Sequence, residues 1–155
     1  RDEILQKCFN LKSIPLSFLI IEMDTVSKKK RSEIMSRIKS KDTKIEILFR
    51  KKLWARGFRF SKNSLKYFGK PDIVLRQYKT VIFIDSCFWH SCKKHLRLPA
   101  IRISYWKNKI KRNKARDMEV NKYYKKSDWK ILRVWEHEIK KNPDRAVNKI
   151  IKFFK

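Results

Sequence analysis

The sequence has few cysteines and no long hydrophobic run, and each shortage excludes a class of protein. Cys8, Cys87 and Cys92 are the three cysteines, and an odd count of three in a chain of this size does not indicate a disulfide framework. We therefore expect a reducing, cytoplasmic setting. The apolar run at 14–21 is interrupted by Pro15 and is far shorter than the roughly 20 residues of a membrane span. We expect no membrane partner, with a cryptic signal segment as the alternative for this run.

Acidic residues are also scarce. The chain has 15 Asp and Glu against 42 Lys and Arg, a formal net charge of +27 at pH 7. With 42% hydrophobic and 13% aromatic residues, it is too apolar for a disordered basic tail. The composition predicts a folded domain that binds a polyanion, although a lysine-rich proteome would inflate the same counts. A length of 155 residues fits a single core.

The charge divides the chain at Met23. Basic and acidic residues balance over 1–22, and the whole excess lies beyond them. Because the segment from Met23 resembles a natural beginning, we interpret 1–22 as an N-terminal extension that is either non-native or disordered. Residues 23–155 are then expected to form one domain.

Hydrophobic periodicity predicts an α/β fold. An apolar helical stripe follows Asp42 and Thr43, either of which suits an N-cap, and it stops at Gly57. Further helices are predicted at 32–37, 103–124 and 143–154. Strands are predicted at 58–62, 72–75, 80–85 and 129–135. The expected architecture is a small mixed β-sheet flanked by helices.

Two apolar segments on either side of Arg76–Lys79 predict a central β-hairpin. Antiparallel pairing about that turn sets Asp72 across from Phe83 or Ile84. Asp72 and Asp85 should then lie at the same end of the sheet.

The helix predicted at 103–124 has a polar break in its inner stripe. Residues that share this face are Ile103, Trp106, Ile110, Asn113, Asp117, Val120 and Tyr124. Unpaired burial of a polar group costs roughly 1–3 kcal/mol. Asn113 and Asp117 are therefore predicted to be hydrogen-bonded or functional.

Cysteine and histidine gather between positions 87 and 137. Zinc takes four nitrogen or sulfur ligands in a tetrahedron. Cys87, Cys92 and His95 supply three from one irregular loop, and His137 would complete the set, with His90 competing for the fourth position. Four protein ligands leave no place for a water, so the zinc would be structural. Two free cysteines with incidental surface histidines are the alternative.

A second constellation suggests a hard cation. Gly69-Lys-Pro-Asp72 precedes a buried strand and places a carboxylate at the sheet edge, where Mg²⁺ prefers oxygen ligands. The Ile84 carbonyl and Asp85 lie across from it. His90 suits proton transfer near neutral pH. A Pro-Asp pair alone is more often a turn, and only the combination favours a nuclease.

Glu46 and three aromatic residues have two interpretations each. Glu46 is placed to orient a metal-bound water or a histidine, and a solvated helix glutamate is the alternative. Phe88, Trp89 and Trp106 suit stacking on bases or wedging between base steps. Core packing is their alternative, most strongly for Trp106 on the inner helix stripe.

Together these motifs resemble the very-short-patch repair endonucleases, a compact branch of the PD-(D/E)xK nuclease superfamily. The match runs from about Ser27 to Phe154. It includes Arg31-Ser-x-x-Met35-x-x-Ile38, Asp42-Thr43-x-x-Glu46, Gly69-x-Pro71-Asp72, Val81-Ile-Phe, Cys87-Phe-Trp-His90, Pro99, Trp106, Lys109-Ile110-x-x-Asn113-x-x-Arg116-Asp117 and Trp135-Glu136-His137.

The resemblance implies a restriction-endonuclease-like fold and Mg²⁺-dependent cleavage of one strand of duplex DNA. The cut would fall beside a T:G mismatch, the product of 5-methylcytosine deamination. By motif position the implied set is Asp72 and the Ile84 carbonyl for Mg²⁺, His90 for catalysis, Glu46 and Asp117 in support, and Phe88, Trp89 and Trp106 as the wedge. The superfamily's second acidic motif is not intact, so Asp85 is either a ligand or, like Asn113, a supporting residue.

Two rival functions remain at this stage. One is a non-catalytic, zinc-stabilised DNA-binding module, and the other is a restriction-type nuclease of the same superfamily that acts on unmismatched sites. For the repair nuclease we expect a bacterial, nucleoid-associated monomer bound to double-stranded DNA.

Overall fold

The computed structural model describes residues 27–37, 41–99 and 101–154. The expected extension at 1–22 lies outside them. The chain divides into two compact units, 1–38 and 39–155. The first carries helix α1 (Lys28–Ser36), which begins earlier than the helix predicted at 32–37. All other elements belong to the second unit.

The second unit is built on a four-stranded mixed sheet, as predicted. Its strands are β1 (Ser61–Lys62), β2 (Ile73–Leu75), β3 (Thr80–Asp85) and β4 (Lys130–Trp135), and they lie in the order β1-β2-β3-β4. The first three pair antiparallel, whereas β3 and β4 run parallel. Ile73 faces Ile82 and Leu75 faces Thr80, which confirms the predicted hairpin register. The strand predicted at 58–62 is shorter, because only its last two residues pair.

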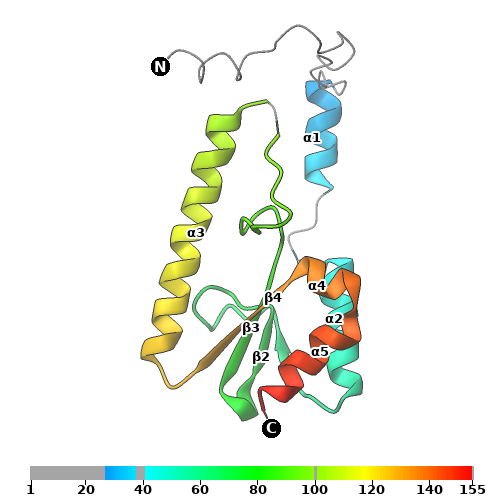
Figure 1. Ribbon diagram of the computed structural model, residues 1–155, viewed down its shortest axis with the longest axis vertical. Coiled ribbons are helices and arrows are strands. Elements are labelled where there is room, and N and C mark those ends of the chain that lie inside the picture. Colours follow the sequence, from blue (N-terminus) through cyan, green and yellow to red (C-terminus); the bar gives the residue numbers. More distant parts are fainter. Residues whose placement is uncertain (1–26, 38–40, 100, 155) are drawn as a thin grey trace, which may run out of the picture. The chain divides into compact units, whose positions relative to one another are not determined.

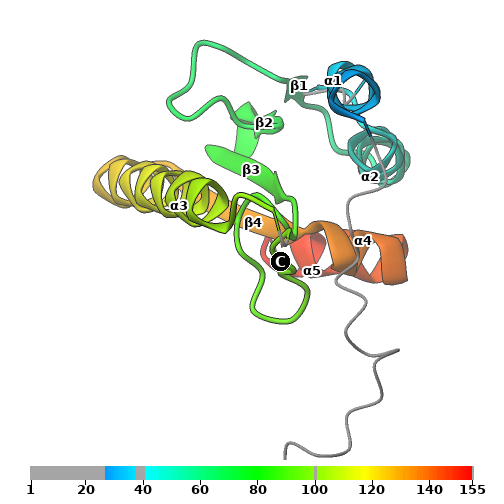
Figure 2. The same cartoon turned by 90° about the horizontal axis from the view of Figure 1, so that it is seen from above.

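Helices cover both faces of this sheet. They are α2 (Lys44–Ala55), α3 (Ile103–Lys126), α4 (Glu136–Lys141) and α5 (Pro143–Lys152). Figures 1 and 2 show α3 on one side of the sheet and α2 with α5 on the other. A parallel strand pair needs a crossover connection, and α3 lies within the one joining β3 to β4. The short helix α4 was not predicted. No helix in the described part of the chain has the length and apolar character needed to cross a membrane.

Strand alternation produces two separate cores. On the α2 and α5 face, the fully buried residues include Leu53, Ile82 and Val147. On the α3 face, the buried cluster is smaller and consists of Val74, Val81, Phe83, Val120 and Tyr124. Adjacent residues such as Val81 and Ile82 point to opposite faces because side chains alternate along a strand.

Gly69 fixes the approach of the chain to Asp72. Its φ is +77°, and a Cβ added there would lie 2.7 Å from a methyl carbon of Val120 on α3. The hydroxyl of Tyr124 donates to the carbonyl of Phe68 at 2.8 Å. The loop before β2 is thus held against α3 at a point where only glycine fits, and this contact sets the position of Asp72.

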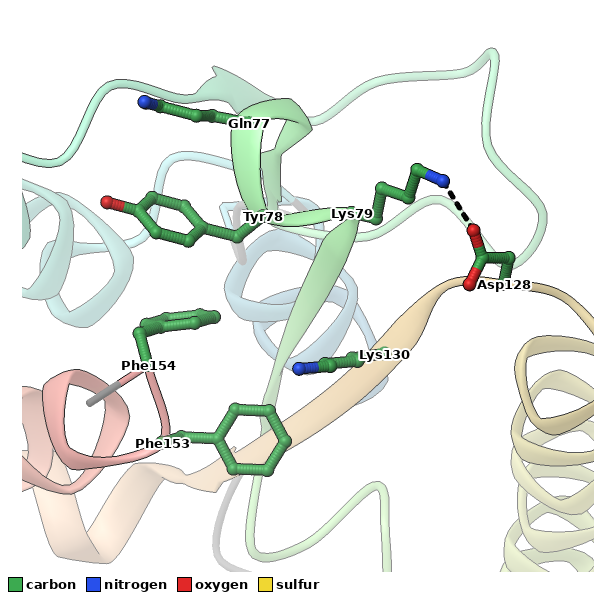
Figure 3. Close-up of a pocket in the computed structure, with 7 residues that line it drawn as sticks. All are labelled: Gln77, Tyr78, Lys79, Asp128, Lys130, Phe153 and Phe154. Atoms are coloured by element: carbon green, nitrogen blue, oxygen red, sulfur yellow. Dashed lines mark hydrogen bonds and ion pairs between the residues drawn. The ribbon is translucent and has the colours of Figure 1, made fainter.

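The opposite end of the sheet carries an open pocket (Figure 3). Its lining residues are Gln77, Tyr78, Lys79, Asp128, Lys130, Phe153 and Phe154. Lys79 pairs with Asp128, and the rings of Tyr78 and Phe154 lie 4.6 Å apart between centroids. Because β3 has six residues, this pocket lies about 16 Å from the Asp85 end of the strand, at ~3.3 Å per residue.

Candidate active site and metal centre

Asp72 lies at the carboxylate-rich end of the sheet, just before β2. The backbone N–H of Ile84 donates to its Oδ2 at 2.7 Å, which fixes the side chain against β3. Burial raises the pKa of Asp72 to about 6, and the nearby charges of Glu46 and Asp85 add to the rise. The N–H of Ile84 and the charge of Arg50 oppose it. A group that resists ionisation for these reasons is one that a bound cation would help to ionise.

Glu46 is buried at the start of α2, with 8% of its surface exposed. Its Oε2 accepts from the backbone N–H of Asp42 at 3.0 Å, and its Oε1 accepts from the Thr43 hydroxyl at 2.8 Å. Thr43 is the N-cap and accepts from the Glu46 N–H. The carboxylate therefore ties Asp42 and the hydroxyl of the N-cap to the start of α2, while its charge still acts on Asp72. The solvated-glutamate alternative is wrong.

His90 is held by a carboxylate from a distant element. Its Nδ1 lies 2.7 Å from Oδ2 of Asp117 on α3 and 3.8 Å from Oδ1 of Asp85 on β3. The backbone is positioned from both sides: the His90 N–H donates to Ser86, and the Asn113 amide donates to the Trp89 carbonyl at 3.1 Å. The predicted polar pair on α3 is thus hydrogen-bonded, and both members contact the same loop.

Asp85 ends β3 and is only 4% exposed. Burial is the largest influence and raises its pKa, while the charges of His90 and Arg133 act in the opposite direction. Arg133 of β4 donates to it at 2.7 Å and also reaches Asp117 at 3.2 Å. Sequence reasoning missed Arg133. The available signal was an arginine on an apolar strand at a position that faces α3.

Four cysteine and histidine side chains form a second group beside these acids. The possible ligand atoms of Cys87, Cys92, His95 and His137 all lie within 4.8 Å of one another. Cys87 Sγ is 3.2 Å from Nδ1 of His137, and Cys92 Sγ is 3.5 Å from Nδ1 of His95. A tetrahedron with zinc–ligand bonds of about 2.0–2.3 Å has edges of about 3.3–3.8 Å. The donor set and spacing therefore suit one tetrahedral ion.

This arrangement separates His90 from the metal group. His90 faces Asp117, while His137 at the start of α4 approaches both cysteines, at 3.2 Å from Cys87 Sγ and 3.7 Å from Cys92 Sγ. The backbone N–H of Cys87 donates to Glu136 at 3.3 Å. The loop after β3 is thus tied to the junction between β4 and α4.

Three aromatic side chains gather next to His90. The ring centroids of Phe88 and Trp89 are 4.9 Å apart, and Trp106 lies 5.3 Å from Phe88 and 5.9 Å from Trp89. All three are partly exposed, and none belongs to either buried cluster. Tyr105 beside them is 49% exposed. They form an aromatic group at the surface, in contrast to the core packing of Tyr124 further along α3.

Basic residues line α3 along its whole length. Exposed lysines and arginines along α3 are Lys107, Lys111, Arg112, Lys114, Arg116, Lys122, Lys125 and Lys126. Glu119 is the exposed acidic residue of the same helix. Such a surface attracts the phosphates of a nucleic acid.

Comparisons with known proteins agree with this arrangement. Residues 23–96 match the family model described as DNA mismatch endonuclease Vsr. The type II nicking enzyme V.NmeAIP of Neisseria meningitidis is 46% identical over 76% of this chain and 84% of its own length. The type II nicking enzyme V.HpaIIP of Haemophilus parainfluenzae is 39% identical over 79% and 89%. DNA mismatch endonuclease Vsr of Escherichia coli is 35% identical over 73% of each chain.

A small mixed sheet flanked by helices, with this family match and these relatives, defines a DNA endonuclease with a restriction-endonuclease-like α/β fold. The chain belongs to the Vsr family of DNA mismatch endonucleases. Membership in a family of nucleases excludes the non-catalytic DNA-binding module as the description of this chain.

Proposed function

We propose that this chain nicks one strand of duplex DNA beside a T:G mismatch left by deamination of 5-methylcytosine, in very-short-patch repair. One observation carries the proposal. Asp72, Asp117 and Trp106 each contact the carboxyl end of β3 or the loop that follows it, which carries Phe88, Trp89 and His90. The name of the E. coli relative, a DNA mismatch endonuclease, supports the choice of substrate.

Mg²⁺ is the proposed catalytic ion, with the Asp72 carboxylate and the Ile84 carbonyl as its protein ligands. The oxygen donors suit this cation, and the buried negative charges of Asp72, Glu46 and Asp85 suit a positive ion between protein and phosphate. When bound, Mg²⁺ would supply charge neutralisation at the scissile phosphate and a more acidic water. Asp85 is assigned a supporting role because its Oδ1 is engaged by Arg133.

His90 is the proposed proton-transfer residue. Its Nδ1 faces Asp117 at 2.7 Å, which favours the tautomer with the proton on Nδ1 and leaves Nε2 to exchange a proton with substrate or water. In the described ranges no hydrogen bond is made by Nε2. Asp117 orients the ring, Asn113 holds the loop through Trp89, and Glu46 supports Asp72 through its charge and the α2 cap.

The aromatic group is proposed to recognise the mismatch. Phe88, Trp89 and Trp106 present partly exposed rings beside His90, and a mismatched step is easier to unstack than a paired one. Wedging there would widen the stack next to the bond to be cut. The exposed basic residues of α3 would hold the flanking phosphates.

Zinc is proposed as the ion held by Cys87, Cys92, His95 and His137, in a purely structural role. Four protein ligands leave no position for water or substrate. The ion would order the loop that carries Trp89 and His90. We further propose that 23–155 acts as a single endonuclease domain, as a monomer, on nucleoid DNA in the bacterial cytoplasm.

A second candidate is nicking of a matched recognition site. Two of the relatives above are named type II nicking enzymes, and those names specify no mismatch. The aromatic group favours the mismatch, because unstacking costs less at a mismatched step than at a paired one.

The deciding experiment incubates the purified chain and Mg²⁺ with duplexes labelled separately on each strand. We expect a nick in one strand of the T:G duplex and none in the matched T:A and C:G controls. Equal nicking of a matched duplex would favour the second candidate. Absence of scission with any divalent ion would refute the proposed catalytic site.

A further inference from the structure

Arg133 joins two acids that face the same histidine nitrogen. From β4, its Nη1 donates to Oδ1 of Asp85 at 2.7 Å, and its Nη2 donates to Oδ1 of Asp117 at 3.2 Å. Nδ1 of His90 lies 2.7 Å from Asp117 and 3.8 Å from Asp85. One guanidinium is therefore shared by the two carboxylates that compete for one imidazole.

The guanidinium has little freedom to move. Its Nε donates to Oδ1 of Asn121 on α3 at 3.0 Å, and its carbon lies 5.0 Å from the centre of the Phe83 ring. The Arg133 side chain is only 19% exposed. Because the donors of arginine are fixed in one plane, these contacts define where both carboxylates stand.

The contacts divide the carboxylate oxygens between Arg133 and His90. Asp117 uses Oδ1 for Arg133 and Oδ2 for His90. On Asp85, the oxygen that Arg133 engages is the same Oδ1 that lies 3.8 Å from His90. Without Arg133, the unpaired carboxylate of Asp85 would have Nδ1 of His90, 3.8 Å away, as a competing hydrogen-bond donor, and the imidazole would be drawn away from Asp117.

We propose that Arg133 is a positioning residue for strand cleavage, which holds Asp117 in place and keeps Asp85 from capturing His90. This inference rests on the proposed function, in which Nε2 of His90 exchanges the proton. Arg133 contacts neither substrate nor reacting atoms. Its effect passes through the orientation of the imidazole ring.

A purely structural ion pair that joins β3, β4 and α3 predicts a different behaviour. Its removal would leave the buried Asp85 charge unpaired and lower stability, and Asp85→Asn would recover part of that stability without changing the nicking rate constant of the folded protein. Under the positioning role, replacing Asp85 by asparagine removes the charge that attracts His90. The second substitution then recovers part of the activity lost by the first.

The test compares Arg133→Gln, Arg133→Lys and the double variant Asp85→Asn/Arg133→Gln in single-turnover nicking of a T:G duplex. For Arg133→Gln we expect the rate constant at saturating DNA to fall on the order of tenfold to a hundredfold, with the half-saturating DNA concentration unchanged. Lysine should restore only part of the rate, because its ammonium lacks the planar fork that spans both acids. The double variant should nick faster than Arg133→Gln.

Asp128→Asn is the matched control. It breaks the ion pair between Lys79 and Asp128, which joins β3 and β4 at the ends far from Asp85 (Figure 3). The rate constant at saturating DNA and the half-saturating DNA concentration should both stay at the wild-type values. A second readout is independent of activity: ¹⁵N NMR of the His90 ring in Mg²⁺-free protein. The Nδ1 resonance should shift in Arg133→Gln, return toward the wild-type value in the double variant, and stay unchanged in Asp128→Asn.

Two results would overturn the positioning role of Arg133 and leave the proposed function intact. One is wild-type nicking by Arg133→Gln while His90→Ala is inactive. The other is a double variant no faster than Arg133→Gln, with an unrestored His90 spectrum. Activity in His90→Ala would instead refute the proposed function at this site, and the positioning role with it.

Discussion

The two faces of the sheet differ in what their side chains do. Against α2 and α5 lies the larger apolar cluster, with Leu53, Ile82 and Val147 fully buried, and the buried polar residues Glu46 and Arg50 lie on α2. Against α3 the buried cluster is smaller. This face also carries Arg133 and Asp117, and α3 is hydrogen-bonded to the loop after β3 through Asp117 and Asn113. Because apolar burial scales with area, we expect the face against α2 and α5 to supply most of the hydrophobic stabilisation, while the face against α3 holds the hydrogen-bonded groups around His90.

The largest effect should come from Asp72→Ala. Loss of a catalytic-metal ligand removes several kcal/mol of transition-state stabilisation, at about 1.4 kcal/mol per tenfold in rate. We expect nicking to fall about a thousandfold or more, with zinc content unchanged in metal analysis. The melting temperature without divalent ions should not fall, because the lost carboxylate lies near two other acids in a buried position. If Asp72→Ala lost its zinc, the separation of the two metal sites would be wrong.

Zinc removal should weaken the loop after β3 more than either core of the sheet. Chelation, or Cys92→Ala, removes the ion proposed to tie the loop after β3 to α4. We expect the free energy of unfolding to fall by several kcal/mol, with the ~10–16 kcal/mol of zinc binding by small zinc domains as an upper limit. Hydrogen exchange should increase first in the loop amides that now pair locally, such as those of Cys92 and Leu96. An unchanged unfolding curve after complete zinc removal would contradict the structural role.

Leu53→Ala tests the stabilising face. Leu53 is fully buried against the sheet, and a leucine-to-alanine cavity costs about 2–5 kcal/mol. Urea unfolding should report that loss, while the nicking rate constant of the folded protein stays at the wild-type value. A parallel fall in that rate constant would show that the two faces are not independent.

Trp89→Ala should have a smaller and more selective effect. One base–aromatic stack contributes about 1–3 kcal/mol, so the preference for T:G over matched DNA should fall by that amount. The dependence of binding on salt should stay nearly intact, at a log–log slope of about −0.9 per phosphate contacted. If truncation of both Phe88 and Trp89 left the preference unchanged, the wedge assignment would be refuted.

The smallest effect is expected at the far end of the sheet, for Asp128→Asn. Both partners of its ion pair are exposed, Lys79 at 63% and Asp128 at 83% of their side chains, and such pairs contribute little in water. Stability and nicking should both match wild type within experimental error. A loss of nicking would show that the pocket of Figure 3 communicates with the active site.

Local and short-range patterns were predictable from the sequence. The hairpin register followed from a short turn between two apolar segments, and α3 begins at the predicted residue, Ile103. The polar break at Asn113 and Asp117 predicted hydrogen-bonded groups, because burying them without partners costs too much.

Long-range choices were not predictable in the same way. His90 and Asp117 are 27 residues apart. Helical periodicity predicted that Asp117 lies on the inner face of its helix, but it could not predict that His90 is its hydrogen-bond partner. Arg133 is 48 residues from Asp85, and its role depends on parallel pairing of β3 with β4, which the hairpin argument did not specify. The six-residue helix α4 is too short for a reliable helical period, so the sequence did not predict the helix that carries His137.

The central claim is that the α3 face of the sheet is the site of single-strand cleavage at a T:G mismatch. The most direct measurement is single-turnover nicking by the wild-type chain and by His90→Ala, with Mg²⁺, on T:G and matched duplexes of the same sequence. The account predicts a single nick in the T:G duplex by wild type, no nick in the matched duplex, and no nick in either by His90→Ala. Equal cleavage of both duplexes, or undiminished cleavage by His90→Ala, would contradict it.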